Sequence, residues 1–511
     1  LKEVNLSETN ITGEALAHLS ENNQLEKLHL SGCGNLEEDF LVEFFRNATQ
    51  LKEVDLSQSW TTGEGLSNIP KNNQLEKLDL NCCSDRDQEE EASFLDETKS
   101  TGEGLSNIPK NNQLEKVMFD RVDESDRIFL KENFLGDFFS KAACLRTISL
   151  CGNTTGEGLA QIPKENQLQE LWLNSCENLK EDFLERFFPK AFHLRMLDLT
   201  AAKTIGEGLS CIPPENHLED LRAGASRGLE KFLKDFFLKA FHLKKVNLSE
   251  TNTTGEELSA LPKKNQLEEL NLSGCDNLKE IYLKEFFLKA FHLKKVCLSQ
   301  TNTTGEGLSH ISLGNRLENL ILGLCENLNE YFLKTFFSKA LCLKEVNLYQ
   351  TNTTGEGLSH ISLGNRLENL SLELCENLNE HFLGIFFLKA VHLKGVNLSE
   401  TNTTGEGLAH ISLGNRLENL SLELCENLNE YFLKWFFSKA AHLKKVNLSE
   451  TNTTGEGLSY IPPKNLLEEL YLDTSKGLGE NFFKAFLSKA FHLKEANVSD
   501  ASTGFSFIKG E

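Results

Sequence analysis

Cysteine and histidine are the residue types in this sequence whose chemistry would be most telling. The 511-residue chain has 13 Cys and 13 His. Gathered in clusters, such residues could bind a metal ion or form disulfides. Here they recur singly at a fixed spacing, and one position of a repeated pattern accounts for seven of the cysteines: Cys33, Cys83, Cys176, Cys275, Cys325, Cys375 and Cys425.

These seven cysteines are expected to be buried structural thiols. Each of these cysteines is expected to follow a strand, and successive cysteines are two strands apart. Their sulfur atoms should therefore lie roughly 10 Å from one another. Disulfides need Cα atoms about 4.4–6.8 Å apart, so the thiols should stay free, and a shared metal site is not expected. Free thiols in an odd total number favour a reducing compartment. We therefore expect a cytoplasmic protein with no metal and no cofactor.

The remaining chemistry-bearing residues give no sign of an enzyme. Most histidines recur at the end of a helical segment, where the helix dipole favours a partial positive charge. The sequence has no phosphate-binding loop, nucleophile elbow, HExxH motif or CxxC pair. We therefore expect no catalytic residues and no enzyme activity.

A repeated unit must position these residues. The string TGEGL, or a close variant, returns along the chain at a spacing that settles at 49 or 50 residues. Each unit has two halves that begin with L-x-x-[LV]-x-L. The A half reads LKKVNLSETNTTGEGLSYIPPKNL from Leu443 to Leu466, and the B half reads LENLSLELCENLNEYFLKWFFSKAAH from Leu417 to His442.

This pattern resembles the leucine-rich repeat, L-x-x-L-x-L-x-x-[N/C/T]-x-L, over nearly the whole chain. The cysteine position and the TGEGLxxI segment resemble the cysteine-containing and ribonuclease-inhibitor-like subclasses. Those subclasses occur in NLR-type innate immune receptors and in F-box substrate adaptors. The resemblance implies an α/β solenoid, or horseshoe, with a concave parallel sheet and convex helices.

The residues agree with that expectation. L-x-x-L-x-L predicts a short strand whose alternate residues enter a core. In the B half, Phe432, Leu433, Phe436 and Phe437 form one apolar helical stripe, and copying of this stripe accounts for 35 Phe against 6 Tyr and 3 Trp. We expect residues 1–511 to form a single solenoid of about twenty alternating repeats of about 24 and 26 residues. The chain begins at Leu1, and we expect it to be a fragment of a larger protein.

The regular pattern fails at about residues 84–130. An acidic stretch, residues 85–91, stands where a helix is expected. Two interpretations remain open, an acidic loop that docks a basic partner and decay of the repeat by unequal crossover. The net charge of −23 disfavours nucleic acid and anionic membranes as main partners. No apolar run is long enough to insert into a membrane.

The strand residue between the last two leucines should point out of the concave sheet. It is nearly constant, Asn or Asp, in A halves and varied in B halves, where Trp, Tyr and Arg are typical of interface hot spots. The predicted partner-binding residues are His29, Asp79, Trp172, Asp198, Arg222, Asn271, Ile321 and Tyr471.

The most favoured function is recognition of a protein ligand on the concave sheet. The resemblance implies the sensing region of an intracellular NLR-type receptor. A substrate-recruiting adaptor of a ubiquitin ligase and an extracellular surface protein remain alternatives. The sequence does not indicate an oligomeric state.

Overall fold

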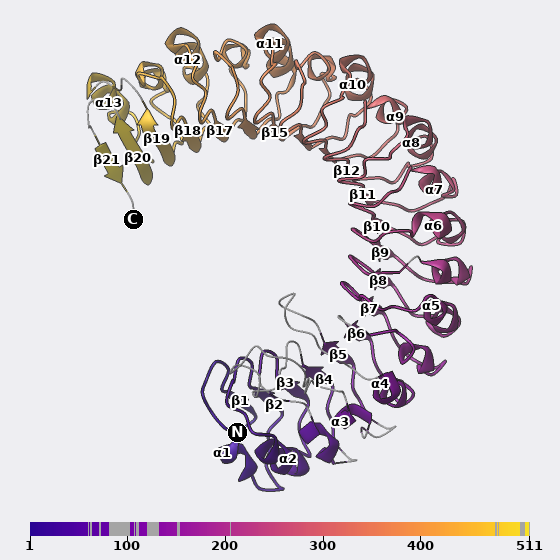
Figure 1. Ribbon diagram of the computed structural model, residues 1–511. Helices are drawn as coiled ribbons and strands as arrows, with labels where there is room; N and C mark the ends of the chain where they lie inside the picture. The colour runs from indigo at the N-terminus through magenta and orange to yellow at the C-terminus, as the bar shows by residue number, and fades with distance from the viewer. Residues whose placement is uncertain are drawn as a thin grey trace, which may run out of the picture. The chain divides into compact units, whose positions relative to one another are not determined.

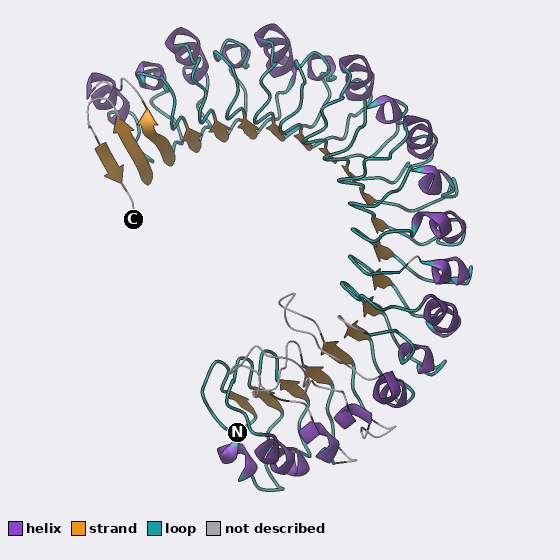
Figure 2. Ribbon diagram, in the orientation of Figure 1, coloured by secondary structure: helices purple, strands orange, loops and turns teal. Residues whose placement is uncertain are grey.

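The structure, a computed structural model, describes residues 1–59, 61, 64–70, 73–80, 103–106, 108, 112–119, 132–150, 154–204, 206–475, 478, 480–500 and 506–509. The chain divides into two compact units, Leu1–Thr251 and Asn252–Glu511. In each unit the strands form one layer and the helices form a second layer behind it (Figure 1 and Figure 2).

The first unit contains ten parallel strands among its described residues, each paired with the next along the chain. They are β1 (Glu3–Asn5), β2 (Lys27–His29), β3 (Glu53–Asp55), β4 (Lys77–Asp79), β5 (Lys116–Phe119), β6 (Thr147–Leu150), β7 (Glu170–Trp172), β8 (Met196–Asp198), β9 (Asp220–Arg222) and β10 (Lys245–Asn247). Its helices are α1 (Glu14–Ala17), α2 (Glu38–Asn47), α3 (Glu103–Ser106), α4 (Glu132–Phe139), α5 (Glu181–Phe187) and α6 (Glu230–Phe237), with short 3-10 helices η1 (Glu64–Asn68), η3 (Leu159–Gln161), η4 (Phe188–Lys190) and η5 (Glu207–Cys211).

The second unit repeats this plan and ends differently. Its strands are β11 (Glu269–Asn271), β12 (Lys295–Cys297), β13 (Asn319–Ile321), β14 (Glu345–Asn347), β15 (Asn369–Ser371), β16 (Gly395–Asn397), β17 (Asn419–Ser421), β18 (Lys445–Asn447), β19 (Glu469–Ser475), β20 (Glu495–Asp500) and β21 (Ser506–Lys509). Its helices are α7 (Glu256–Ser259), α8 (Glu280–Phe287), α9 (Glu306–Ser309), α10 (Glu330–Phe337), α11 (Glu380–Lys389), α12 (Glu430–Phe437) and α13 (Glu480–Leu487), with η6 (Leu358–His360), η7 (Leu408–His410) and η8 (Glu456–Tyr460). Strands β11 to β20 pair in parallel and β21 pairs antiparallel to β20.

Leucine and phenylalanine fill the core between the two layers, as the sequence predicts. Leu433, Phe436 and Phe437 of α12 are at most 1% exposed, and the two phenylalanine rings meet with centroids 5.0 Å apart. Phe432, also assigned to the apolar stripe, is only half-buried, because it lies at the margin of that stripe. The Phe excess is thus a core pair copied from one B helix to the next.

The Thr-Gly-Glu-Gly segment is fixed by its neighbours in the preceding B half. Gly355 adopts a left-handed φ of 81°, which glycine tolerates best. The carboxylate of Glu330, at the start of α10, accepts hydrogen bonds from Thr353 Oγ1 at 2.8 Å, Thr354 N at 2.6 Å and Gly357 N at 2.6 Å. One carboxylate therefore ties this B helix to the A segment of the next repeat.

Strand pairing continues across the irregular part of the sequence. β4 pairs with β5 in register, with Leu78 opposite Val117 and Asp79 opposite Met118. The acidic stretch 85–91 itself lies outside the described residues, so the choice between a docking loop and repeat decay stays open.

Candidate functional site

Three of the predicted partner-binding residues lie side by side on the strand face of the first unit. Trp172 on β7 is opposite Asp198 on β8, and Asp198 is opposite Arg222 on β9. The Arg222 guanidinium carbon lies 5.1 Å from the centroid of the Trp172 ring, a cation–π distance. These three residues form what we call the Trp172 cluster.

The charge of Arg222 is held by acids on two strands. Its Nη2 lies 3.0 Å from Asp220 Oδ2, and its Nη1 lies 4.0 Å from Asp198 Oδ2. Burial opposes the charge, but the hydrogen bond to Asp220 and the nearby Asp198 and Glu170 carboxylates raise the pKa of Arg222. The side chain of Arg222 is still 39% exposed, whereas that of Asp198 is 8% exposed. The cluster therefore offers a fixed cation and an aromatic edge to a partner.

His29 and Asp79 occupy a separate part of the same face, which carries both acidic residues and lysines. The His29 ring nitrogens lie 4.0 Å from Glu3 Oε1 and 3.8 Å from Asp55 Oδ2. Asp55 is opposite Asp79 in the sheet. His29, Asp55 and Asp79 help to line a small hollow of about 100 Å³.

The three predicted residues of the second unit do not come together. Asn271 lies on β11, Ile321 on β13 and Tyr471 on β19. Asn271 Oδ1 accepts a hydrogen bond from Ser273 N at 3.0 Å, so it also stabilises its own turn. Tyr471 donates to Glu495 Oε1 at 2.7 Å, and this bond, with burial and the Glu469 charge, raises the pKa of the phenol. Tyr471 is therefore tied to the last parallel strands.

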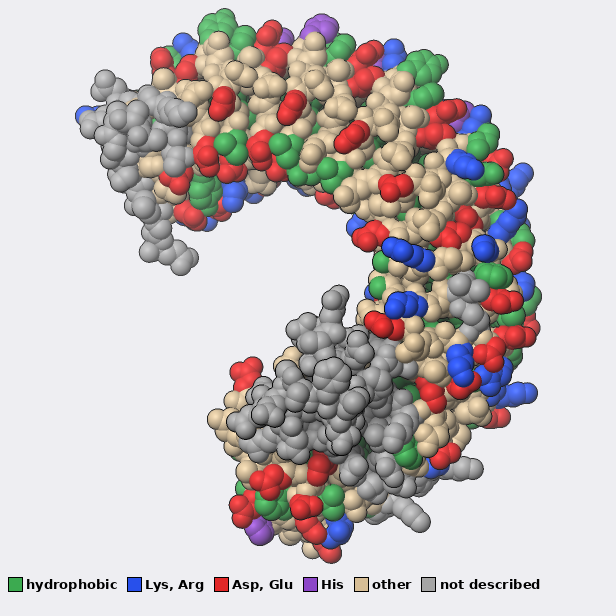
Figure 3. Space-filling model, viewed as in Figure 1, with side chains coloured by type: hydrophobic (Ala, Val, Ile, Leu, Met, Phe, Trp, Pro, Cys, Tyr) green, Lys and Arg blue, Asp and Glu red, His purple; other side chains and the backbone are tan. Residues whose placement is uncertain are grey.

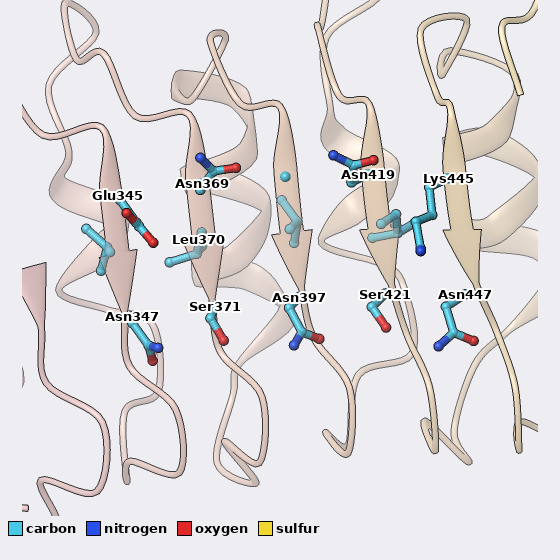
Figure 4. Close-up of a pocket in the computed structure, with 14 residues that line it drawn as sticks. Glu345, Asn347, Asn369, Leu370, Ser371, Asn397, Asn419, Ser421, Lys445 and Asn447 are labelled. Carbon is cyan, nitrogen blue, oxygen red and sulfur yellow. The ribbon is translucent and has the colours of Figure 1, made fainter. Parts of the chain in front are cut away.

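A larger hollow lies over β14 to β18, and sequence reasoning missed it. Its volume is about 440 Å³. Figure 4 shows alternating amide and hydroxyl side chains along its floor, at the carboxyl ends of neighbouring strands: Asn347, Ser371, Asn397, Ser421 and Asn447. The only charged residues in this lining are Glu345 and Lys445.

Gly395 opens the middle of this hollow. It takes the strand position that Lys295 holds on β12 and Lys445 holds on β18. A Cβ at Gly395 would meet Asn369 Oδ1 at 2.5 Å, so a side chain there would displace the amide beside it. The change from LKKV to LKGV in one copy of the repeat was the signal in the sequence that could have found this site.

Two of the asparagine side chains in the floor of the hollow are oriented by glutamates that do not line it. Asn397 Nδ2 donates to Glu373 Oε2 at 2.8 Å, and Asn447 Nδ2 donates to Glu423 Oε2 at 3.0 Å. These bonds orient the two amides, while Ser371 on β15 lies between Asn347 and Asn397 across the sheet. The arrangement can exchange hydrogen bonds with a neutral polar ligand.

The seven repeated cysteines are what we call the cysteine ladder, and those that the structure describes lie away from the Trp172 cluster and from the hollow over β14 to β18. Its described members are buried, free thiols: Cys33, Cys176, Cys275, Cys325, Cys375 and Cys425. Cys325 Sγ donates to Leu298 O at 2.9 Å, and burial raises the pKa of this thiol. Cys83, the seventh, lies outside the described residues. These thiols therefore pack under the strand face and do not line it.

The described residues form neither a metal centre nor a membrane-spanning helix. Among them, no three His, Cys, Asp or Glu side chains are gathered as a metal site requires. Each helix in this part of the chain is too short or too polar to cross a bilayer.

No protein-family model matches the sequence, and no curated protein matches it. Among solved structures, the crystal structure of a TLR13–ssRNA13 complex matches with a TM-score of 0.52 at 17% sequence identity. The match covers 96% of this chain and 65% of the TLR13 chain. This chain therefore spans less than two thirds of the length of the TLR13 chain. The fold is a leucine-rich-repeat solenoid. A long parallel sheet backed by helices, predicted from the repeat, is confirmed.

Proposed function

We propose that this leucine-rich-repeat chain is a recognition module that binds a protein ligand on its strand face. The observation that carries the proposal is the Trp172 cluster. A half-buried tryptophan and a partly exposed arginine, brought together across β7 to β9, are the residue types that dominate binding energy at protein interfaces. The hollow over β14 to β18, in the second unit, is a separate surface suited to the polar groups of a ligand.

A protein ligand fits this face better than a nucleic acid does. TLR13 was crystallised with ssRNA13, and a shared fold allows a similar ligand here. Nucleic-acid binding, however, depends on clustered, available positive charge. Arg222 is instead paired with Asp198 and Asp220, and the hollow carries one Lys and one Glu.

We also propose that the module belongs to an intracellular NLR-type receptor, in the cytoplasm, and that it has no catalytic activity. Support comes from the cysteine-containing repeat and from the free thiols. In this proposal residues 1–511 are one repeat array, since the repeat continues in sequence through the boundary between the two units. A nucleotide-binding segment in the same gene product would favour the receptor, and an F-box would favour the ubiquitin-ligase adaptor.

Affinity capture with the full chain tests the binding proposal. Proteins recovered from cell extract by the wild type are compared with those recovered by Trp172→Ala and by Ser371→Arg, which fills the hollow. The matched control is Leu388→Ala on helix α11, whose side chain is 53% exposed. The proposal expects Trp172→Ala to lose a protein ligand that the wild type and the control recover, and Ser371→Arg tests separately whether the hollow of the second unit contributes to ligand binding. Equal recovery by all variants, or Trp172-dependent binding of a single-stranded RNA oligonucleotide in place of a protein, would contradict it.

A further inference from the structure

A second surface runs along the edge of the second unit where the chain enters its B strands. Five turns form it, at residues 262–266, 312–316, 362–366, 412–416 and 462–466, and we call them the pre-strand turns. They carry six exposed basic residues and no acidic one: Lys263, Lys264, Arg316, Arg366, Arg416 and Lys464. The corresponding sequence segments of the first unit are mixed in charge, since they carry Glu21, Glu165 and Glu215 together with Lys71, Lys110 and Lys164.

The positive charge of the pre-strand turns is not cancelled by the strand beginnings beside them. There, five lysines pair with five glutamates at 2.7–2.8 Å: Lys294–Glu268, Lys344–Glu318, Lys394–Glu368, Lys444–Glu418 and Lys494–Glu468. Those pairs are neutral as a set. Within the described chain, none of the six basic residues of the turns lies in an ion pair, so their charge faces solvent.

Three of the pre-strand turns also present a leucine at the tip. Leu313, Leu363 and Leu413 are 72%, 77% and 81% exposed. The glycine after each one has open space around it, since a Cβ at Gly314, Gly364 or Gly414 would meet nothing within 4 Å. A single exposed leucine is ordinary on a protein surface, but here three exposed leucines recur at the same turn position along one edge of the unit.

The turns that carry these leucines are held in shape. Asn315 Nδ2 donates to Ser312 O at 2.7 Å within the turn and to Lys339 O at 3.3 Å in the following B half. Asn365 makes the same pair of bonds, to Ser362 O and Lys389 O. The leucine tips and the arginines three residues later are thus presented in a fixed relation.

The opposite edge of the second unit is acidic. The turns that follow its strands expose Asp276, Glu326, Glu376, Glu400, Glu426 and Glu450. Acidic side chains recur along the face of this unit that is seen in Figure 3, with Lys and Arg side chains among them. The net charge of −23 describes the whole chain and does not reveal that these two edges of the second unit differ in sign.

We infer that the pre-strand turns dock the second unit on an anionic membrane surface. Equivalent turns are two strands apart, so the leucine tips are roughly 10 Å from one another with cations between them. A protein interface needs a contiguous, desolvated apolar centre, which separate tips do not supply. A fluid lipid interface accepts each leucine independently, while lipid phosphates attract the basic residues. The docking is peripheral and independent of the strand-face ligand.

Vesicle sedimentation of the full chain tests this inference. The probes are phosphatidylcholine vesicles with about 30% phosphatidylserine and vesicles of phosphatidylcholine alone. We expect binding to the first, weakened by salt, and little binding to the second. No binding to the anionic vesicles at low salt would overturn the inference.

Two triple variants identify the surface. One replaces Leu313, Leu363 and Leu413 by Gln, and the other replaces Arg316, Arg366 and Arg416 by Gln, the residue that the chain itself has at Gln266. Each should weaken vesicle binding about tenfold or more. Circular dichroism of each variant checks that it is folded. Undiminished binding by both folded variants would overturn the inference.

Control variants distinguish docking by this edge from adhesion by exposed leucine or by net charge. Leu288→Gln with Leu388→Gln removes one leucine just after helix α8 and one from helix α11, and binding should be unchanged. Replacing Glu326, Glu376 and Glu426 by Gln should not weaken binding. A gain in that variant as large as the loss in the arginine variant would overturn the inference, because net charge alone would then govern binding.

A competing anionic polymer and a strand-face variant complete the test. A chain that binds polyglutamate through Arg316, Arg366 and Arg416 but binds no vesicles would make the edge a docking site for an acidic protein, and would overturn the inference. Trp172→Ala should bind vesicles as the wild type does. Loss of the strand-face ligand and loss of vesicle binding are therefore separate results.

Discussion

The guanidinium carbon of Arg222 lies 5.1 Å from the centroid of the Trp172 ring, although 50 residues separate them in the sequence. The parallel register of β7, β8 and β9 creates this contact, with Asp198 on the strand between them. Each three-residue strand presents only its first and last residues on the strand face, so a binding surface here is assembled across repeats. Binding and folding should therefore respond separately to changes at this cluster.

Trp172→Ala and Arg222→Ala should each weaken ligand binding by about tenfold or more, as hot-spot truncations do. Neither side chain belongs to the core, so the free energy of unfolding should fall by no more than about 1 kcal/mol. Titration of the captured ligand and urea unfolding measure the two effects. A double-mutant cycle on unfolding should give a coupling of about 0.5–1 kcal/mol between the residues.

Arg222→Lys is the matched control for this prediction. It keeps a positive charge near Asp198 and Asp220 but loses the planar group that stacks on an aromatic ring. Its binding should lie between that of wild type and that of Arg222→Ala. If Arg222→Ala binds the ligand as tightly as the wild type does, the Arg222 guanidinium does not contribute to the interface.

Glu330→Ala should destabilise the junction between two repeats. The carboxylate accepts hydrogen bonds from Thr353 Oγ1, Thr354 N and Gly357 N, and its loss leaves these donors without their partner. The cost should be about 1–3 kcal/mol. Because repeats in a solenoid depend on their neighbours, faster amide hydrogen exchange should centre on residues 353–360. Glu326→Ala, an exposed carboxylate four residues earlier, is the control and should leave exchange unchanged.

Gly357→Ala should be more harmful than Gly364→Ala, though both lie in one A half. A Cβ at position 357 would meet Leu333 Cβ at 2.5 Å and Glu330 Oε2 at 2.9 Å, whereas a Cβ at position 364 would meet nothing within 4 Å. Overpacking of this kind costs about 1–3 kcal/mol. Urea unfolding of the two variants gives the comparison. Equal stability would mean that the α10 helix moves aside without penalty.

Regular features of this fold could be predicted from the sequence because each is local and copied. In the A half from Leu443 to Leu466, Val446 in β18 and Leu448 just after it alternate with polar residues, and both are fully buried. The stripe of Leu433, Phe436 and Phe437 needs only helical periodicity. In both cases the physics acts within one repeat.

Features that depend on two or more repeats were not predictable in the same way. The hydrogen bonds of Glu330 reach the next repeat. In the sequence, Glu330 looks like any acidic residue in the first turn of a helix, so these bonds could not be predicted from it. The hollow at Gly395 exists because glycine stands where other A strands have a lysine side chain, as at Lys295 and Lys445. Of the eight residues chosen for the concave face, register brings Trp172, Asp198 and Arg222 together as one cluster, while His29 and Asp79 line a separate small hollow. Side-chain identity in one strand does not reveal its neighbours.

The lysine–glutamate pairs at the strand beginnings should make the first unit sensitive to acid. Glu26 bonds to Lys2 at 2.7 Å and to Lys52 at 2.9 Å, and these bonds lower its pKa from 4.5 to about 2. A carboxyl whose pKa is lower in the folded state stabilises that state above its unfolded pKa, and the contribution is lost as pH falls toward 2. Wild type should thus be more stable than Glu26→Gln at pH 6, and the difference should shrink between pH 4.5 and 2. Urea unfolding across this pH range measures the difference in stability.

Because the pairs are exposed, 0.5 M salt should reduce the difference between wild type and Glu26→Gln at pH 6. A difference between wild type and Glu26→Gln that stays constant from pH 6 to pH 2 would show that the ion pairs do not cause it.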